Sequence, residues 1–147
     1  FEHTAIWNNG QMIVWGGLNI FGFESGTGGM YNPVDDSWVS IDTSTAPAPR
    51  FGHTAIESQG KMMVWGGQGG GFYFNDGAVY DPSNDIWEPI QLDGAPGPRA
   101  EHSAVWTGSE MIIWGGNVNG ENPGDLFYMN DGGRLRLSSR MFLYQKQ

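Results

Sequence analysis

The sequence predicts an all-β fold built from three copies of one structural unit. Two observations carry this prediction. A repeat of about 50 residues runs through the whole chain, and each copy contains an apolar, strand-like run that ends on a pair of glycines. In addition, no stretch combines the 3.6-residue apolar spacing of an amphipathic helix with helix caps.

The repeat is clearest at the start of each copy. Residues 1–6, 51–56 and 100–105 read FEHTAI, FGHTAI and AEHSAV, at offsets of 50 and 49 residues. Over the first 17 positions, copies one and two share 11 identities, and copies one and three share 9. We therefore divide the chain into repeats 1–50, 51–99 and 100–147, which together form one domain.

Four short strands are expected in each repeat. The first follows the repeated His, and the second, 12–15 in copy one, is continuously apolar, which favours a strand covered on both faces. A Gly-rich loop of variable length leads to a third strand ending at Tyr31 or Tyr80. A Pro- and Asp-containing turn follows. The fourth strand then opens at Trp38 or Trp87, seven residues after the Tyr in both copies.

Several repeated residues are assigned structural roles. The glycine pairs permit a positive φ or a close backbone approach at the end of the second strand, and Trp and Tyr supply large contact areas between units. A repeated His is expected to hydrogen-bond the backbone. The structural set is His3, His53, His102, Gly16, Gly17, Gly66, Gly67, Gly115, Gly116, Tyr31, Tyr80, Trp38 and Trp87.

The Gly-Gly pair after an apolar strand, followed by Tyr, six residues and Trp, resembles kelch repeats. The resemblance covers copies one and two and the first two strands of copy three. It implies that each repeat is a four-stranded antiparallel blade of a β-propeller. The HTAxW and WGG segments resemble secreted bacterial kelch proteins, which implies an extracellular or periplasmic location.

Copy three departs from the pattern after Gly133. Leu135 takes the Tyr position, Phe142 takes the Trp position, and the Asn-Pro turn is missing. We expect a shortened hairpin, with strands at 134–137 and 140–144 joined by a turn at 138–139. Four of the seven basic residues and none of the acids lie in 134–147. This favours a solvated strand edge that resists pairing over a docking patch.

Three blades leave the ring incomplete, because propellers have about 4 to 8. Two apolar faces are then left to be covered by other blades. We expect the chain to be the last three blades of a longer propeller; a ring of two chains with six blades is the alternative.

Composition argues against several classes of function. The net charge of −9 disfavours nucleic acid and anionic membrane surfaces, and no apolar run approaches the roughly 18 residues of a membrane span. The chain has no Cys. Its three His occupy one repeat position, which spreads them around the ring instead of bringing them to one metal ion. We expect no catalysis and no cofactor.

The acidic residues give no strong indication of an acid/base pair or of a calcium site. Asp35 and Asp36 are adjacent and are expected in a solvated turn. The segments 75–77 and 130–132, both Asn-Asp-Gly, have oxygen ligands for calcium but too few of them, so turn formation is favoured. Gly69–Gly71 is expected to be a flexible loop, because no helix follows it to bind phosphate.

A binding surface is the remaining expectation. The loops between the second and third strands, 18–27, 68–76 and 117–131, vary most and carry aromatic residues that no turn requires. Structurally, Phe72, Phe74, Phe127 or Tyr128 could instead begin the third strand and pack between blades. The function expected is protein interaction or assembly; carbohydrate binding, or a place in a larger kelch-containing enzyme, is the alternative. The candidate binding residues are Phe21, Phe23, Phe72, Tyr73, Phe74, Phe127 and Tyr128.

Overall fold

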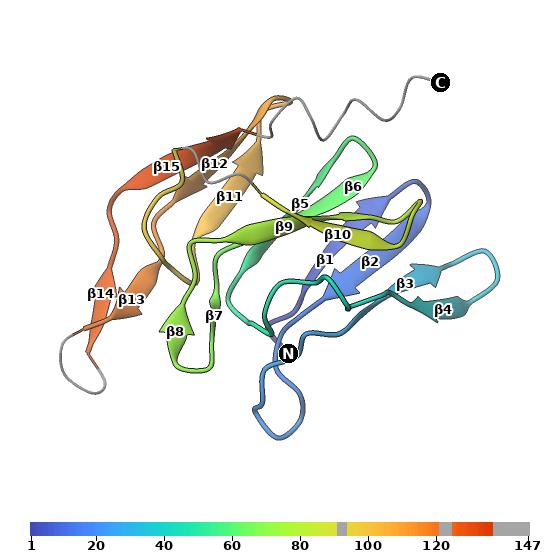
Figure 1. Cartoon of the computed structure of the whole chain (residues 1–147), viewed down its shortest axis with the longest axis horizontal. Coiled ribbons are helices and arrows are strands. Elements are labelled where there is room, and N and C mark those ends of the chain that lie inside the picture. Colours follow the sequence, from blue (N-terminus) through green and yellow to red (C-terminus); the bar gives the residue numbers. More distant parts are fainter. Residues whose placement is uncertain (91–93, 121–124, 137–147) are drawn as a thin grey trace.

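Three antiparallel sheets, one from each repeat, stand next to one another in the computed structural model, which describes residues 1–90, 94–120 and 125–136 (Figure 1). The first two sheets have four strands each, and the described part of the third has three. The first sheet contains β1 (Thr4–Asn8), β2 (Gln11–Trp15), β3 (Gly28–Asn32) and β4 (Ser37–Ser40). The second contains β5 (Thr54–Ser58), β6 (Lys61–Trp65), β9 (Gly77–Asp81) and β10 (Ile86–Pro89). The third contains β11 (Ser103–Trp106), β12 (Glu110–Trp114) and β15 (Gly132–Arg136).

The strands follow one another across each sheet, as the sequence predicts for a blade. The order is β1-β2-β3-β4 in the first blade and β5-β6-β9-β10 in the second. In both, the third strand carries the predicted Tyr, and the Trp of the fourth strand pairs with it: Tyr31 with Trp38, and Tyr80 with Trp87. The all-β architecture of antiparallel blades is thereby confirmed, and the described blades do not close a ring.

Local sequence explains the tight hairpin turns. In the first two blades the turn between the first and second strands is Asn9-Gly10 or Gln59-Gly60, and all four residues have positive φ. Two consecutive positive φ angles produce the turn whose twist matches antiparallel strands. Asp36 and Asp85 also have positive φ just before the fourth strand, where each accepts a hydrogen bond from the Tyr of the third strand.

The core lies between the blades. One cluster joins Ile13 and Trp15 of the first blade to Met62 and Val64 of the second. Another joins Met63 and Trp65 to Met111, Ile113 and Leu135 of the third. Because alternate residues of β6 point to opposite faces, the middle blade contributes to both clusters, and Met62–Trp65 are all buried.

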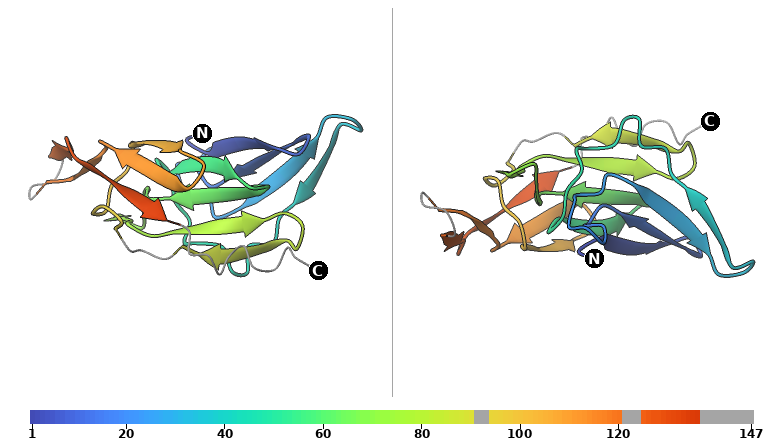
Figure 2. Two further views of the ribbon diagram at one scale, coloured as in Figure 1. Left: turned by 90° about the horizontal axis from the view of Figure 1, so that it is seen from above. Right: turned by 90° about the horizontal axis from the view of Figure 1, so that it is seen from below.

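The sequence predicted that the second strand of each blade is covered on both faces. Blades one and three each leave one face open, so their second strands are covered on one face only. β12 alternates between buried and more exposed residues, and Trp114 is 61% exposed whereas its counterpart Trp65 is fully buried. The predicted double cover holds only for β6. Figure 2 shows the reason: the three sheets lie in a row, with the middle one between the other two.

In the third blade, β15 pairs with β12 and provides the third strand. The fourth strand and turn expected at 140–144 and 138–139 lie outside the described residues. Arg134, on β15, is mostly exposed and approaches Glu110 at 3.8 Å. Within the described residues, no helix is long and apolar enough to cross a membrane.

Candidate binding surface

The connections between second and third strands all lie at one end of the blades, the lower end in Figure 1. In the first blade this is a loop pinned by Asn19, whose side-chain oxygen accepts hydrogen bonds from the backbone N–H groups of Phe21 and Phe23. In the second it is a hairpin, β7 (Gln68–Gly69) and β8 (Phe72–Tyr73). In the third it is a longer hairpin, β13 (Asn117–Asn119) and β14 (Leu126–Tyr128).

These hairpins correct two expectations from the sequence. Gly69–Gly71 is part of a hairpin and not a free loop: Gly69 pairs with Phe72, and Gly70 and Gly71 form the turn with φ of +59° and +84°. The third strand of the blade begins later, at Gly77 or Gly132. The aromatic residues proposed as its start therefore lie outside it: Phe72, Phe74, Phe127 and Tyr128.

Hydrogen bonds join the three connections into one surface, which we call the loop rim (residues 18–27, 68–76, 117–120 and 125–131). Glu24 of the first blade accepts a hydrogen bond of 3.1 Å from the Gly70 N–H of the second. Tyr73 of the second donates from its hydroxyl to the side-chain oxygen of Asn119 of the third, at 3.1 Å. The rim is thus fixed to the blades and braced between them.

Five of the seven candidate aromatic residues remain exposed on the rim, with more than half of each residue open to solvent. Tyr73 and Phe74 are half-buried instead. Tyr73 braces the neighbouring hairpin, and the Phe74 ring packs 4.1 Å from the guanidinium carbon of Arg50. The exposed members are Phe21, Phe23, Phe72, Phe127 and Tyr128.

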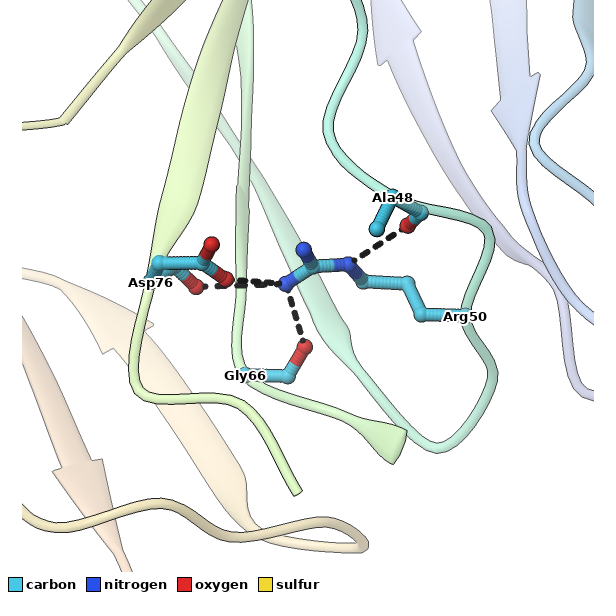
Figure 3. A network of polar contacts seen from close by, with 4 residues as sticks. All are labelled: Ala48, Arg50, Gly66 and Asp76. Carbon is cyan, nitrogen blue, oxygen red and sulfur yellow. Dashed lines mark hydrogen bonds and ion pairs between the residues drawn. The ribbon is translucent and has the colours of Figure 1, made fainter. Parts of the chain in front are cut away.

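A buried arginine anchors the rim in each of the last two blades, a feature that the sequence analysis missed. Arg50 is fully buried and donates to the carbonyl oxygens of Ala48 and Gly66, at 3.0 Å each (Figure 3). It also donates to the Asp76 carboxylate at 2.8 Å, and to the Asp76 carbonyl.

Arg99 repeats the arrangement with Gly97, Gly115 and Asp131. The two Asn-Asp-Gly segments considered as calcium ligands therefore hold arginines. The sequence signal was the Pro-Arg pair before the second and third repeats, together with an Asp directly before the third strand of the blade that follows.

The charge of the rim is uniformly acidic. Residues 18–27, 68–76, 117–120 and 125–131 contain four Asp and Glu and no Lys or Arg. The carboxylates of Asp76 and Asp131 are about half exposed or more even though each binds an arginine, with side-chain exposures of 54% and 65%. Because Arg50 and Arg99 are buried, the solvent-facing side of the rim combines aromatic rings with negative charge.

The three histidines have different environments: two are buried between blades and one is exposed. His53 and His102 are buried at successive blade interfaces, where Nε2 shares a hydrogen bond of 2.7 Å with the hydroxyl of Thr4 or Thr54. This hydrogen-bond partner is a side chain of the preceding blade. His3 is exposed. Among the described residues, no three His, Asp or Glu side chains are grouped so that they could hold a metal ion.

The other repeated residues also take different environments in different blades. All six glycines of the Gly pairs have positive φ, between 70° and 95°. Tyr80 and Trp87 are buried between the first two blades, whereas Trp38 is 56% exposed. A shared sequence position therefore gives the same backbone but not the same burial.

A family model described as the KLHDC2/KLHL20/DRC7 Kelch-repeats domain matches residues 2–136. This match covers all the described strands. No curated protein matches the chain.

Proposed function

The chain belongs to the kelch-repeat family, and we propose that it is a non-catalytic protein-interaction module that binds its partner with the loop rim. Kelch domains serve as protein-interaction modules in general. The surface, the partner and the lack of catalysis are our proposal.

The five exposed aromatic residues of the rim carry this proposal. Aromatic side chains supply large contact areas at little cost in conformational entropy, and they are enriched among the residues that dominate binding energies. Here they project from loops that hydrogen bonds tie to each other and to buried arginines. A rigid scaffold that displays exposed aromatic rings is suited to recognition, because little order has to be gained on binding.

The acidity of the rim suggests the chemistry of the partner. A segment that combines apolar and basic side chains would place its apolar groups against Phe72 or Phe127. Its Lys or Arg groups would lie near the exposed carboxylates and over the aromatic faces. We propose a basic, partly apolar protein segment as the ligand.

The absence of catalysis is supported by how the candidate chemical groups are used. His53 and His102 are buried in separate interfaces, and Asp76 and Asp131 bind arginines. Adjacent Asp35 and Asp36 each hydrogen-bond a different neighbour, Ser37 and Tyr31 respectively. These groups do not converge on a common substrate position.

Quantitative capture tests the proposed surface. The chain and the triple variant Phe21→Ala/Phe72→Ala/Phe127→Ala are used to capture proteins from the native source. Any protein that the wild-type chain captures and the triple variant does not is then purified. Its affinity for the wild-type chain and for the variant is measured by calorimetric titration. We expect affinity to fall by about tenfold or more with the variant. Val34→Ala is the matched control, because Val34 is exposed in a turn outside the rim and should not matter. Equal binding by the triple variant would place the contact surface elsewhere.

Carbohydrate binding is the second candidate, favoured by the exposed rings of Phe127 and Tyr128, whose faces also suit sugars. A glycan array separates the two. Retention of a glycan that the triple variant loses would favour a carbohydrate ligand, and no retention on any glycan would leave the protein partner.

A further inference from the structure

The chain contains two Asn-Gly pairs, and the structure gives them different surroundings. Asn9 and Gly10 form the turn between β1 and β2, whereas Asn119 ends β13 and is followed by Gly120. An Asn that precedes Gly is chemically labile, because the backbone nitrogen of the Gly can attack the carboxamide carbon of the Asn and glycine has no side chain to shield that nitrogen. In a folded protein the reaction depends on whether the nitrogen and the carboxamide are held by other groups.

In the first pair, both reacting groups are accessible. Asn9 and Gly10 are exposed, and neither the Gly10 N–H nor the Asn9 carboxamide forms a hydrogen bond with a described residue. A Cβ built on Gly10 meets no atom of the described residues within 4 Å. Asn9 also has a φ of +48°, a left-handed conformation that residues other than glycine adopt at a cost. Leaving this conformation to close a ring therefore loses little.

In the second pair, both reacting groups are held by hydrogen bonds. The Gly120 N–H donates to the Asp125 carbonyl oxygen at 2.8 Å. The side-chain oxygen of Asn119 accepts a hydrogen bond of 3.1 Å from the Tyr73 hydroxyl. Both bonds have to break before the Gly120 nitrogen can reach the Asn119 carboxamide, so this pair is protected by the same contacts that brace the loop rim.

The equivalent turn of the second blade, Gln59-Gly60, has the same backbone but lacks this reactivity. Its φ angles are +54° and +79°. Gln has a longer side chain, which would have to close a larger and less favourable ring. In addition, the Gly60 N–H donates to Glu57 Oε1 at 2.8 Å. In the first blade Trp7 takes the position of Glu57, and its indole ring has no acceptor for the Gly10 N–H.

The contacts between the first two blades show that a preceding blade does not hold the N–H of this turn. Asn8 of the first blade donates to the Gly60 carbonyl oxygen of the second at 2.9 Å, whereas the Gly60 N–H bonds within its own blade. The Asn9 side chain faces the following blade, with Nδ2 at 3.4 Å from a Cβ built on Gly60. The accessibility of the Gly10 nitrogen is therefore a property of the turn itself.

We propose that Asn9 is a site of spontaneous deamidation and that Asn119 is protected from the same reaction by the fold. The Gly10 nitrogen forms a bond to Asn9 Cγ and loses its proton, and the carboxamide nitrogen leaves with that proton as ammonia. Water then opens the cyclic imide at either of its carbonyl carbons. The product is aspartate or isoaspartate at position 9, and water is the one co-reactant consumed.

The modification changes the charge of a polar hollow between the first two blades. This hollow, of about 320 Å³, is lined by Asn9 together with Lys61 and Asp81, which form an ion pair of 2.9 Å and are mostly buried. A new carboxylate at position 9 would compete for the Lys61 ammonium group. Isoaspartate would also lengthen the backbone of a two-residue turn, which the pairing of Asn8 with Gln11 does not accommodate.

Tandem mass spectrometry of proteolytic peptides tests the proposal, after incubation of the full chain at slightly alkaline pH and physiological temperature. Deamidation is measured from the mass gained when –NH2 is replaced by –OH. We expect conversion at Asn119 to be at least about fivefold slower than at Asn9, the factor that corresponds to breaking two hydrogen bonds of ordinary net strength. Asn9→Gln is the matched variant, since the second blade has Gln at this position with the same backbone. It should abolish the mass gain at position 9.

The same incubation of the chain unfolded in guanidinium chloride separates the effect of the fold from that of the local sequence. We expect the two sites to convert at similar rates there, because the contacts of Asn119 and Gly120 are then lost. The proposal is overturned if the preference for Asn9 is no larger in the folded chain than in the unfolded one. It is equally overturned if Asn9 stays intact in the folded chain over the time in which the unfolded chain loses it.

Discussion

Thr4 Oγ1 and His53 Nε2 lie 2.7 Å apart across the interface between the first and second blades. Desolvation, with a smaller contribution from the charge of Arg50, lowers the pKa of His53 from 6.5 to about 3. Desolvation and the charge of Arg99 likewise lower the pKa of His102 to about 4. Both imidazoles are therefore neutral in the folded protein at pH 7. Protonation of either buried ring would destabilise its interface, because burial disfavours the charged form.

Stability should fall as the pH is lowered from about 6.5. In the unfolded chain each histidine binds a proton near pH 6.5, but in the folded protein only near pH 3 or 4. Between these values the unfolded state binds more protons, so the free energy of unfolding decreases with falling pH. The limit is about 1.4 kcal/mol per pH unit for each histidine. Urea denaturation between about pH 5 and 7.5, a window above most carboxylate pKa values, measures the effect.

The double variant His53→Gln/His102→Gln is the control for this pH dependence. It should be less stable than the wild type at pH 7.5, because the packing of two buried rings is altered, but nearly insensitive to pH in the same window. An equally steep dependence in the variant would mean that other groups cause it.

Removal of the Arg50 side chain should destabilise the second blade strongly. Arg50→Ala leaves the Gly66 and Asp76 carbonyl oxygens without their buried donor and removes the ion pair with Asp76. We expect a loss of about 2–4 kcal/mol in the free energy of unfolding, since each buried acceptor left without its donor costs about 1–3 kcal/mol. Arg50→Lys should recover little, because an ammonium group cannot reproduce the geometry of the guanidinium group.

Asp76→Ala separates the ion pair from the backbone contacts of Arg50. The Asp76 side chain is 54% exposed, so solvent screens the pair, and its loss should cost only about 1 kcal/mol. Chemical denaturation of both variants gives the comparison. If Asp76→Ala were as damaging as Arg50→Ala, the ion pair rather than the carbonyl contacts would hold the rim.

Gly66 is expected to tolerate Ala less well than Gly10 does. Both have positive φ, +70° for Gly66 and +86° for Gly10. A Cβ on Gly10 meets no atom of the described residues within 4 Å, whereas one on Gly66 would lie 2.6 Å from His102 Cε1. His102 cannot withdraw without losing its bond to Thr54.

Thermal denaturation of Gly66→Ala and Gly10→Ala therefore isolates the steric cost, since backbone strain is common to both. We expect Gly66→Ala to be less stable by about 1–3 kcal/mol, the usual cost of overpacking. Equal losses in the two variants would show that the imidazole is displaced easily.

Sequence periodicity predicted the blades well because each strand and turn is encoded locally. The apolar run 62–65, the Gly pair after it and the spacing from Tyr80 to Trp87 all mark elements that the structure contains. Burial was not predictable in the same way. Trp15 and Trp114 have the same repeat position and the same backbone, but only Trp15 has a blade against it.

The parts of the rim that the sequence did not reveal depend on contacts between distant residues. Arg is usually exposed, so the Pro-Arg pairs gave no reason to expect buried side chains. The hairpins β7–β8 and β13–β14 are short and Gly-rich, and their aromatic residues suggested the start of a longer strand. Nothing local shows that Tyr73 would reach across to Asn119, 46 positions later.

Equivalent tryptophans should differ in their contribution to stability according to their neighbours. Trp87 is 3% exposed, packs against Trp15 and Tyr80, and donates from Nε1 to the Asp42 carbonyl at 3.1 Å. Trp87→Ala should therefore cost about 3–5 kcal/mol of unfolding free energy. Trp38 is 56% exposed and stacks only on Tyr31 among the described rings, so Trp38→Ala should cost about 1 kcal/mol or less. Denaturation at submicromolar concentration, monitored by far-ultraviolet circular dichroism, compares the two variants without association. Comparable losses would mean that the face around Trp38 is covered within a single folded chain.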